Sequence, residues 1–195
     1  MDSKQLLDDV RAWAEAHGVQ VRLQPLKREL AGVFDRVSAS LNTGFGVEEL
    51  TYYLAHALGS MVRWSLSRDA VQALFDELRA AKADGADAPR LSRAITAYRA
   101  FEVESSEFAV WLLTELGHED AVAAFTNFMR ADLEALTEFY QSGQAPVWRA
   151  FFARWNKEVA AGQRQVEPFR PKPIPAFTPV VIENQEIVQK QGSGR

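Results

Sequence analysis

Apolar residues recur every three or four positions at the start of the chain. They run from Leu6 to Ala14, a spacing that places them on one face of a helix. Asp2 or Ser3 can cap the first turn, and Gly18 is a typical helix stop. The pattern therefore predicts an N-terminal amphipathic helix.

The spacing of apolar residues changes to every second position in the next segment. Val19, Val21 and Leu23 alternate with polar residues, which predicts a half-buried strand. The same alternation predicts two further short strands at residues 32–34 and 37–41, and a turn between them would make them a hairpin. We expect the three strands to form a small antiparallel or mixed sheet.

From residue 47 onward the apolar pattern is helical. Glycines end the segments, and Pro, Asp or Ser restart them, which is the usual chemistry of helix ends. The predicted helices cover residues 47–66, 69–83, 91–115, 119–140 and 147–159. A small sheet followed by a larger helical portion indicates a mostly helical α+β fold, with a wholly helical bundle as the runner-up.

The C-terminal part of the chain is rich in proline. Proline at this density cannot continue a helix or a central strand, so an extended arm is predicted. The prolines are Pro168, Pro171, Pro173, Pro175 and Pro179. The chain thus divides into one globular domain at residues 1–162 and an extended arm at residues 163–195.

Composition narrows the possible classes of function. The chain has 195 residues, 47% of them hydrophobic and 25% charged, which is ordinary for one soluble globular domain. Its net charge is 22 − 26 = −4, so direct nucleic-acid binding is not expected. The absence of cysteine excludes disulfides, thiolate metal sites and a cysteine nucleophile. No apolar run approaches the ~18 residues of a membrane span, so we predict a cytoplasmic location, or one within a virion or multiprotein complex.

One predicted helix carries a histidine in a context typical of zinc peptidases. Zincins have the helical motif His-Glu-x-x-His, in which the histidines bind zinc and the glutamate is the general base. Here the segment reads His56-Ala57-Leu58-Gly59-Ser60. The first ligand position is kept, but alanine cannot accept a proton and a serine hydroxyl is a poor zinc ligand. The competing interpretation is a core helix with a hydrogen-bonded histidine.

The order of a helix, a three-stranded sheet, a His-bearing helix and a later Glu-bearing helix resembles the ImmA/IrrE metallopeptidases. The segment "LAHALGS" resembles their "LAHELGH", and "FEVESSEFAVWLL" resembles their "E-x-x-A-N-x-F-A-x-x-L-L". The resemblance places Glu102 at the third-ligand position, with Ser105 and Ser106 replacing Ala and Asn. It covers residues 1–116 as a peptidase-like part and leaves 117–162 as a helical extension. The matching apolar positions are Phe108, Ala109, Leu112 and Leu113.

The resemblance implies proteolysis, or metal-dependent inactivation, of helix-turn-helix repressors in phage immunity or DNA-damage responses. Only His56 and Glu102 remain as vestigial metal ligands, with Glu104 as a nearby substitute. Catalytic zinc normally has three protein ligands, and the loss of the base at Ala57 removes a contribution of roughly 10²–10⁴-fold. We therefore expect a pseudoenzyme with no catalytic residues and no cofactor, with zinc as the alternative.

Other polar groups are assigned structural roles. His118 follows Gly117 at a predicted junction between two helices, although "ELGH" echoes the end of the peptidase motif. His17 lies at the end of the first helix, where a cation is favourable. The acidic residues of "ADLEALTEF" are predicted to lie on a solvated helix face.

Two segments are candidates for binding a partner protein. Four aromatic residues after Pro146 form one stripe, which either packs on the core or docks a partner. The arm segment "FTPVVIENQEIV" either belongs to a disordered tail or adds a strand, or fills a groove, on a neighbour. The candidate partner-binding residues are Trp148, Phe151, Phe152, Trp155, Phe177, Val180, Val181 and Ile182.

Three functions are compatible with these features. The first is a non-catalytic relative of the ImmA/IrrE peptidases that binds or regulates another protein, a function compatible with a phage or mobile-element origin. The second is a structural or accessory subunit of a larger assembly, tethered by its C-terminal arm. The third is an atypical active metallopeptidase that uses His56, Glu102 and one further ligand.

Overall fold

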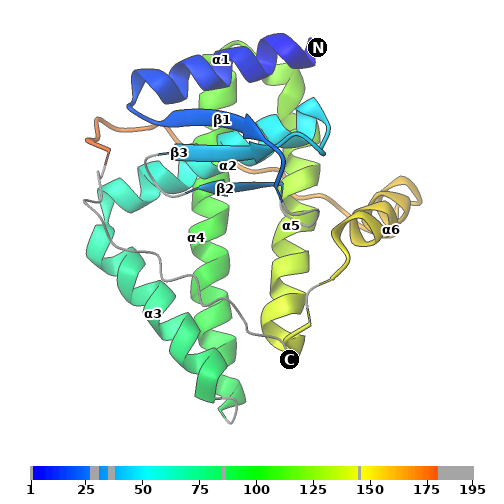
Figure 1. The fold of residues 1–195 in the computed structure, drawn as a ribbon. Helices are drawn as coiled ribbons and strands as arrows, with labels where there is room; N and C mark the ends of the chain where they lie inside the picture. Colours follow the sequence, from blue (N-terminus) through cyan, green and yellow to red (C-terminus); the bar gives the residue numbers. More distant parts are fainter. Residues whose placement is uncertain (1, 27–30, 35–37, 85–86, 145, 180–195) are drawn as a thin grey trace.

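The computed structural model describes the chain except for residues 1, 27–30, 35–37, 85–86, 145 and 180–195. The fold is mostly helical α+β, as predicted: an N-terminal helix, a three-stranded sheet and then a series of helices (Figure 1). The elements are α1 (Ser3–Ala16), β1 (Gln20–Gln24), β2 (Gly32–Phe34), β3 (Ser38–Asn42), α2 (Val47–Leu66), α3 (Arg68–Asp84), α4 (Ala88–Glu115), the 3-10 turn η1 (Glu119–Ala121), α5 (Val122–Ser142) and α6 (Trp148–Ala160). Within the described residues no helix is long and apolar enough to cross a membrane.

The sheet is mixed, which selects one of the two predicted arrangements. Its strand order is β1-β3-β2, with β1 parallel to β3 and β2 antiparallel to β3. The turn predicted near residues 35–36 lies outside the described residues. Val19 and Val21 are buried as expected, whereas Leu23 is 46% exposed. Leu23 departs from the pattern because it lies near the end of β1, an edge strand with β3 as its one neighbour in the sheet.

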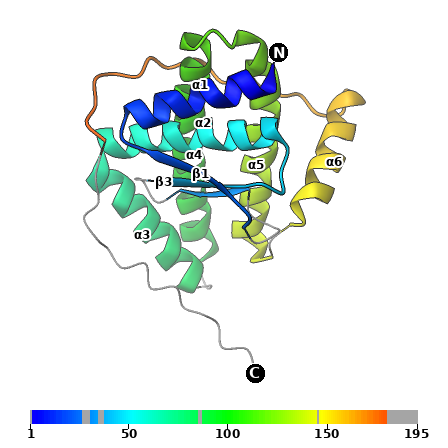
Figure 2. The same cartoon turned by 45° about the horizontal axis from the view of Figure 1, so that its top comes forward.

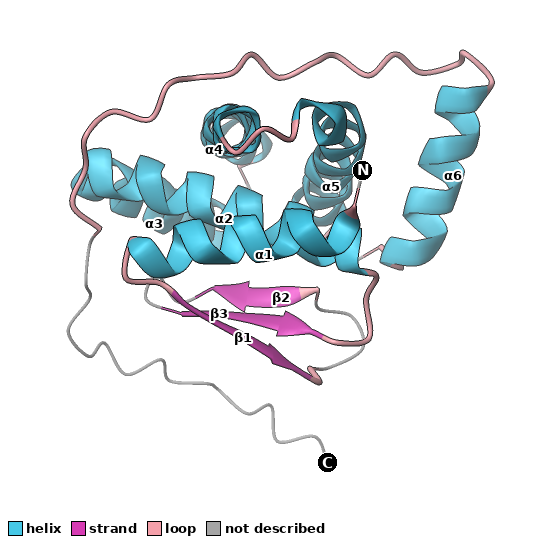
Figure 3. Cartoon of the chain, turned by 90° about the horizontal axis from the view of Figure 1, so that it is seen from above, coloured by secondary structure: helices cyan, strands magenta, loops and turns pink. Residues whose placement is uncertain are grey.

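Helix α2 lies in the centre of the molecule. It contacts α1, β2 and β3 as well as α3, α4 and α5, and Figure 3 shows it between α1 and the sheet on one side and the long helices α4 and α5 on the other. Its buried residues therefore surround most of the helix. A Cβ atom on Gly59 would collide with the backbone carbonyl of Ser105 on α4. The absence of a side chain at Gly59 thus lets α2 and α4 approach closely.

The helix ends follow local chemistry that is visible in the sequence. Helix α4 begins three residues before the predicted position because the Asp87 side chain accepts a hydrogen bond from the Arg90 N–H, with Pro89 in the first turn. The junction predicted at Gly117 is confirmed, since Gly117 has a φ of 80° and η1 follows it. His17 is the C-cap of α1, as expected.

The described part of the arm contains no helix or strand but follows the surface of the domain. After α6 it runs alongside α5 and then α4 and reaches the C-terminal end of α1 (Figures 2 and 3). Phe169 is 4% exposed and lies 6.3 Å, ring to ring, from Phe125 of α5. Phe177 stacks on His17 of α1. Residues 163–179 are therefore an extended arm that packs on its own domain.

Candidate functional site

His56 and Glu102 face each other across the contact between α2 and α4. The distance from His56 Nε2 to Glu102 Oε2 is 2.7 Å. Both side chains are largely buried, with exposed fractions of 12% and 11%. The structure therefore brings together the two residues that the sequence singled out as vestigial ligands, and it does so through the helix approach at Gly59 and Ser105.

Ser106 fixes how the imidazole of His56 can be protonated. Its Oγ–H donates to the carbonyl of Glu102 at 2.9 Å, and its Oγ lies 3.2 Å from His56 Nδ1. A hydroxyl has one hydrogen, so Ser106 can only accept from the ring, and Nδ1 must be the donor. The second ring nitrogen, Nε2, is in contact with the carboxyl group of Glu102 at 2.7 Å. Neither ring nitrogen offers a lone pair to a metal ion while these contacts are made.

The other positions of the degenerate motif carry no metal-binding chemistry. Ala57 is buried in the core, and Ser60 is half-buried on α2, one turn after His56. Glu104, which the sequence suggested as a substitute ligand, does not take that place. It forms ion pairs with Arg63 and Lys172 instead. Glu104 lies two positions after Glu102, and side chains two positions apart on a helix point to different faces.

The donor set does not fit a zinc site. Within the described part of the chain, no group of three or more His, Asp or Glu side chains could hold a metal ion. Catalytic zinc in proteins normally has three protein ligands. His56 and Glu102 instead satisfy each other at hydrogen-bond distance.

The series Ser106–His56–Glu102 also has the composition of a Ser-His-acid triad, but its arrangement does not suit nucleophilic attack. Ser106 is 2% exposed, in the interior of α4. Its hydroxyl donates to a carbonyl of its own helix. A nucleophile must reach the substrate and pass its proton to the histidine, and Ser106 does neither.

Further titratable groups surround the pair. Burial raises the pKa of Asp132 on α5 to about 6, with His56 opposing the shift and Glu102 adding to it. Burial, Asp132 and Glu102 together raise the pKa of Tyr53 to about 12, and burial and then Glu102 hold the pKa of Tyr98 well above its ordinary value. The site is thus a largely buried polar cluster of one histidine, two carboxyl groups and two phenols.

Sequence reasoning missed these surrounding groups. Asp132 belongs to the acidic run that was predicted to be a solvated face, yet it is half-buried. The one available signal was its position between Ala131 and Leu133, both of which are buried. An acid flanked by core residues on a helix is a candidate for partial burial, but spacing alone does not show which side chain it faces.

The aromatic stripe packs on the core, which is one of the two predicted alternatives. Phe151 and Trp155 are 7% and 4% exposed and pack with Ala131 and Ala135 of α5. The other two stripe residues are half-buried. The rings of Trp148 and Phe152 lie 5.4 Å and 5.6 Å from that of Phe128 on α5. The face that these four residues share is turned towards α5, and their role in partner binding stays a prediction.

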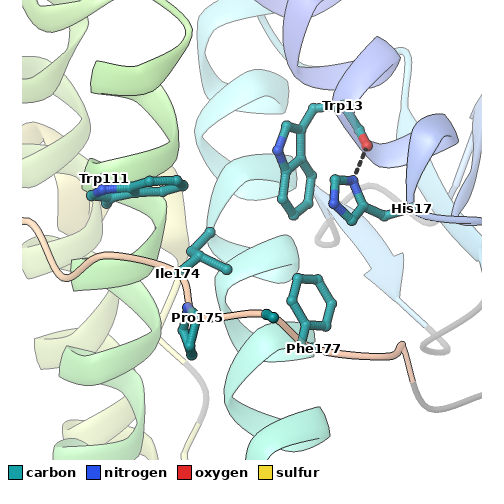
Figure 4. A pocket seen from close by; sticks show the side chains of 7 residues that line it. Trp13, His17, Trp111, Ile174, Pro175 and Phe177 are labelled. Atoms are coloured by element: carbon teal, nitrogen blue, oxygen red, sulfur yellow. Dashed lines mark hydrogen bonds between the residues drawn. The ribbon is translucent and has the colours of Figure 1, made fainter.

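The arm lines a pocket at the end of α1. The pocket has a volume of about 270 Å³ and lies between α1, α4 and the arm (Figure 4). Trp13 and His17 stack at 3.8 Å, and Phe177 lies 5.5 Å from His17 with its ring almost parallel. The other predicted arm residues, Val180, Val181 and Ile182, lie outside the described residues. The lining residues are Trp13, His17, Trp111, Ile174, Pro175, Ala176 and Phe177.

Comparisons of this chain with protein-family models, with curated proteins and with solved structures found no match in any of the three.

Proposed function

We propose that this protein is a non-catalytic, protein-binding or regulatory factor with the layout of a zinc peptidase of the ImmA/IrrE type. The observation that carries the proposal is the direct 2.7 Å contact between His56 Nε2 and Glu102 Oε2. The two potential ligands of the degenerate motif bind each other, and Nδ1 donates to Ser106. The polar cluster then has a structural role, because it joins α2 to α4 through buried hydrogen bonds.

Three features support the absence of peptidase chemistry. Ala57 occupies the place of the general base and has no group that accepts a proton. Ser60 occupies the place of the second ligand. Glu104, the acid suggested as a substitute ligand, is held by two cations, Arg63 and Lys172. An active centre would therefore need to break the His56–Glu102 contact and recruit a further ligand.

Zinc analysis of the purified protein tests this proposal. Wild type and His56→Gln are each titrated with Zn²⁺ and analysed for bound metal, and hydrolysis of an unstructured protein such as casein is measured in parallel. Glutamine keeps an amide that can donate to Glu102, so the variant is expected to fold. We expect no stoichiometric zinc and no hydrolysis in either protein.

A second histidine variant provides the matched control. His118→Gln changes a histidine that is also paired with a carboxyl group, Asp9, but lies outside the cluster. Stoichiometric zinc in wild type and His118→Gln that disappears in His56→Gln would overturn the proposal and establish an atypical metal site.

A further inference from the structure

The arm of this protein is anchored to the domain at its first aromatic residue. Phe169 is buried against Phe125, and the guanidinium group of Arg130 lies 4.0 Å from the centre of its ring. The same arginine donates from Nε to the carbonyl of Glu167 at 2.9 Å. A side chain of α5 thus binds both a ring and a backbone carbonyl of the arm.

The middle of the arm binds to α4 through charge and backbone contacts. The Lys172 N–H donates to the carbonyl of Glu107 at 3.1 Å. Its ammonium group pairs with Glu104 and lies 5.2 Å from the centre of the Phe108 ring. Helix α4 therefore presents a carboxylate and a backbone acceptor to a basic, extended chain. We use "groove" for the surface that the arm covers here, formed by Glu104, Glu107 and Trp111 of α4 with Trp13 and His17 of α1.

The end of the described arm packs against an aromatic site. Ile174 and Phe177 are half-buried and pack against the main core of the domain. Figure 4 shows Trp111 of α4 on one side of this part of the arm and Trp13 and His17 of α1 on the other. Phe177 completes a stack of three rings with Trp13 and His17.

These contacts have the chemistry by which proteins recognise proline-rich peptides. Prolines at alternate positions hold a chain extended before it binds, which lowers the entropy cost, and aromatic grooves bind such chains. In the arm, Pro171, Pro173 and Pro175 alternate with Lys172 and Ile174. The basic residue meets an acid of the groove, and the apolar residue meets the aromatic site.

We propose that the groove formed by α1 and α4 is a docking site for a basic, proline-rich segment of a partner protein, and that the arm occupies this site in cis. The partner segment would carry a basic residue between two prolines, followed by apolar residues, because this pattern fits Glu104 and the pocket. The partner must displace the arm, so the arm sets a threshold for binding.

The tether makes this competition strong. A segment held by a short flexible linker has an effective concentration of about 1 mM. For a peptide with an intrinsic Kd of about 10 µM, such a competitor weakens the apparent affinity by about 100-fold. Releasing the arm should therefore uncover a binding activity that wild type largely hides.

The experiment uses a fluorescein-labelled peptide with the sequence of residues 164–179, titrated by anisotropy with full-length proteins. The double variant Ile174→Asp/Phe177→Asp releases the arm from the pocket, and its fold is checked by circular dichroism. Lys172→Glu is a milder second variant, because it places a carboxylate opposite Glu104. We expect the peptide to bind both variants at least tenfold more tightly than wild type.

Matched controls separate the groove from other surfaces. Trp111→Ala, added to the double variant, should weaken peptide binding at least tenfold. Val147→Ala, at a residue that is 75% exposed and does not line the pocket, should leave it unchanged. No saturable binding to the released variants, or equal binding to wild type, would overturn the proposal. Concentration-dependent dimers of wild type that disappear in the double variant would assign the groove to the arm of a second copy and overturn its assignment to a partner.

This inference builds on the protein-binding part of the proposed function. The peptide titration involves neither zinc nor hydrolysis, so its failure would leave the zinc result standing. Conversely, zinc binding by His56 would overturn the proposed non-catalytic role and leave the peptide groove intact.

Discussion

Two histidine–carboxylate pairs in this protein have the same chemistry but different surroundings. His56 pairs with Glu102 at 2.7 Å between α2 and α4, and His118 pairs with Asp9 at 2.9 Å between the α4–η1 junction and α1. The histidines are similarly exposed, at 12% and 14%. The acids are not: Glu102 is 11% exposed and Asp9 is 34% exposed.

We expect burial of the acid to decide how much such a pair contributes to the free energy of unfolding. An exposed carboxylate that loses its partner is solvated by water, and the cost is small. A buried carboxylate that loses its partner stays poorly solvated by water, which costs several kcal/mol. Removing the histidine from each pair should therefore separate the two sharply.

The largest expected effect is that of His56→Ala. The substitution leaves Glu102 largely buried without its imidazole partner. It also removes the contact between His56 Nδ1 and Ser106 Oγ. We expect a loss of about 3–5 kcal/mol in the free energy of unfolding, measured by urea denaturation. Adding Glu102→Leu should recover much of this loss, since it removes the stranded carboxyl group; a double variant no more stable than His56→Ala would contradict this account.

Gly59→Ala tests the helix contact that forms the buried pair. The new methyl group would collide with the backbone carbonyl of Ser105, so α2 and α4 must move apart. Overpacking of this kind costs about 1–3 kcal/mol, measured by thermal or urea unfolding. Ser60→Ala, on the same helix but half-buried, is the matched control and should cost less.

A pH series tests Asp132, the second carboxyl group of the buried cluster. Burial raises the pKa of Asp132 from 3.8 to about 6. Between these values the native state holds a proton that the unfolded chain releases, so this group makes stability fall as the pH rises from about 4 to 6. We expect a contribution of about 1–2 kcal/mol, smaller than the full linkage value because Asp132 is half-buried. Urea denaturation of wild type and Asp132→Asn at each pH isolates it, and parallel pH profiles would refute it.

The smallest effect is expected for His118→Ala. Asp9 remains in contact with solvent when its partner is removed, so the loss should be about 1 kcal/mol or less. Measured beside His56→Ala under the same conditions, this value completes the comparison. Equal losses in the two variants would show that burial of the acid is not the deciding factor.

Much of the fold could be predicted from local patterns. The limits of α2 at Val47 and Leu66 coincide with those expected, because a 3.6-residue apolar period and helix-ending residues act within a few positions of each other. The three strands were found by their alternation. The start of α4 was missed by three residues, because the Asp87 cap and Pro89 were assigned to the preceding loop.

The candidate site could be predicted only in part. His56 and Glu102 were paired through a resemblance between two segments, and their contact depends on a helix crossing that spacing alone does not define. The turn of Glu104 towards Arg63 and Lys172 could not be predicted, because Lys172 lies on the distant arm. The partner of the aromatic stripe was likewise one of two open alternatives.

The sequence by itself determined the elements, the lack of a proton acceptor at Ala57, the poor zinc-binding chemistry of Ser60, and the extended character of the arm. These properties are set by residue type and by neighbours within a few positions, where backbone sterics and side-chain chemistry act directly. Tertiary structure alone decided that Asp132 joins the buried pair and that residues 169–177 dock on α5, α4 and α1. Burial and electrostatic coupling depend on which helix faces meet, and those faces meet only when the chain is folded.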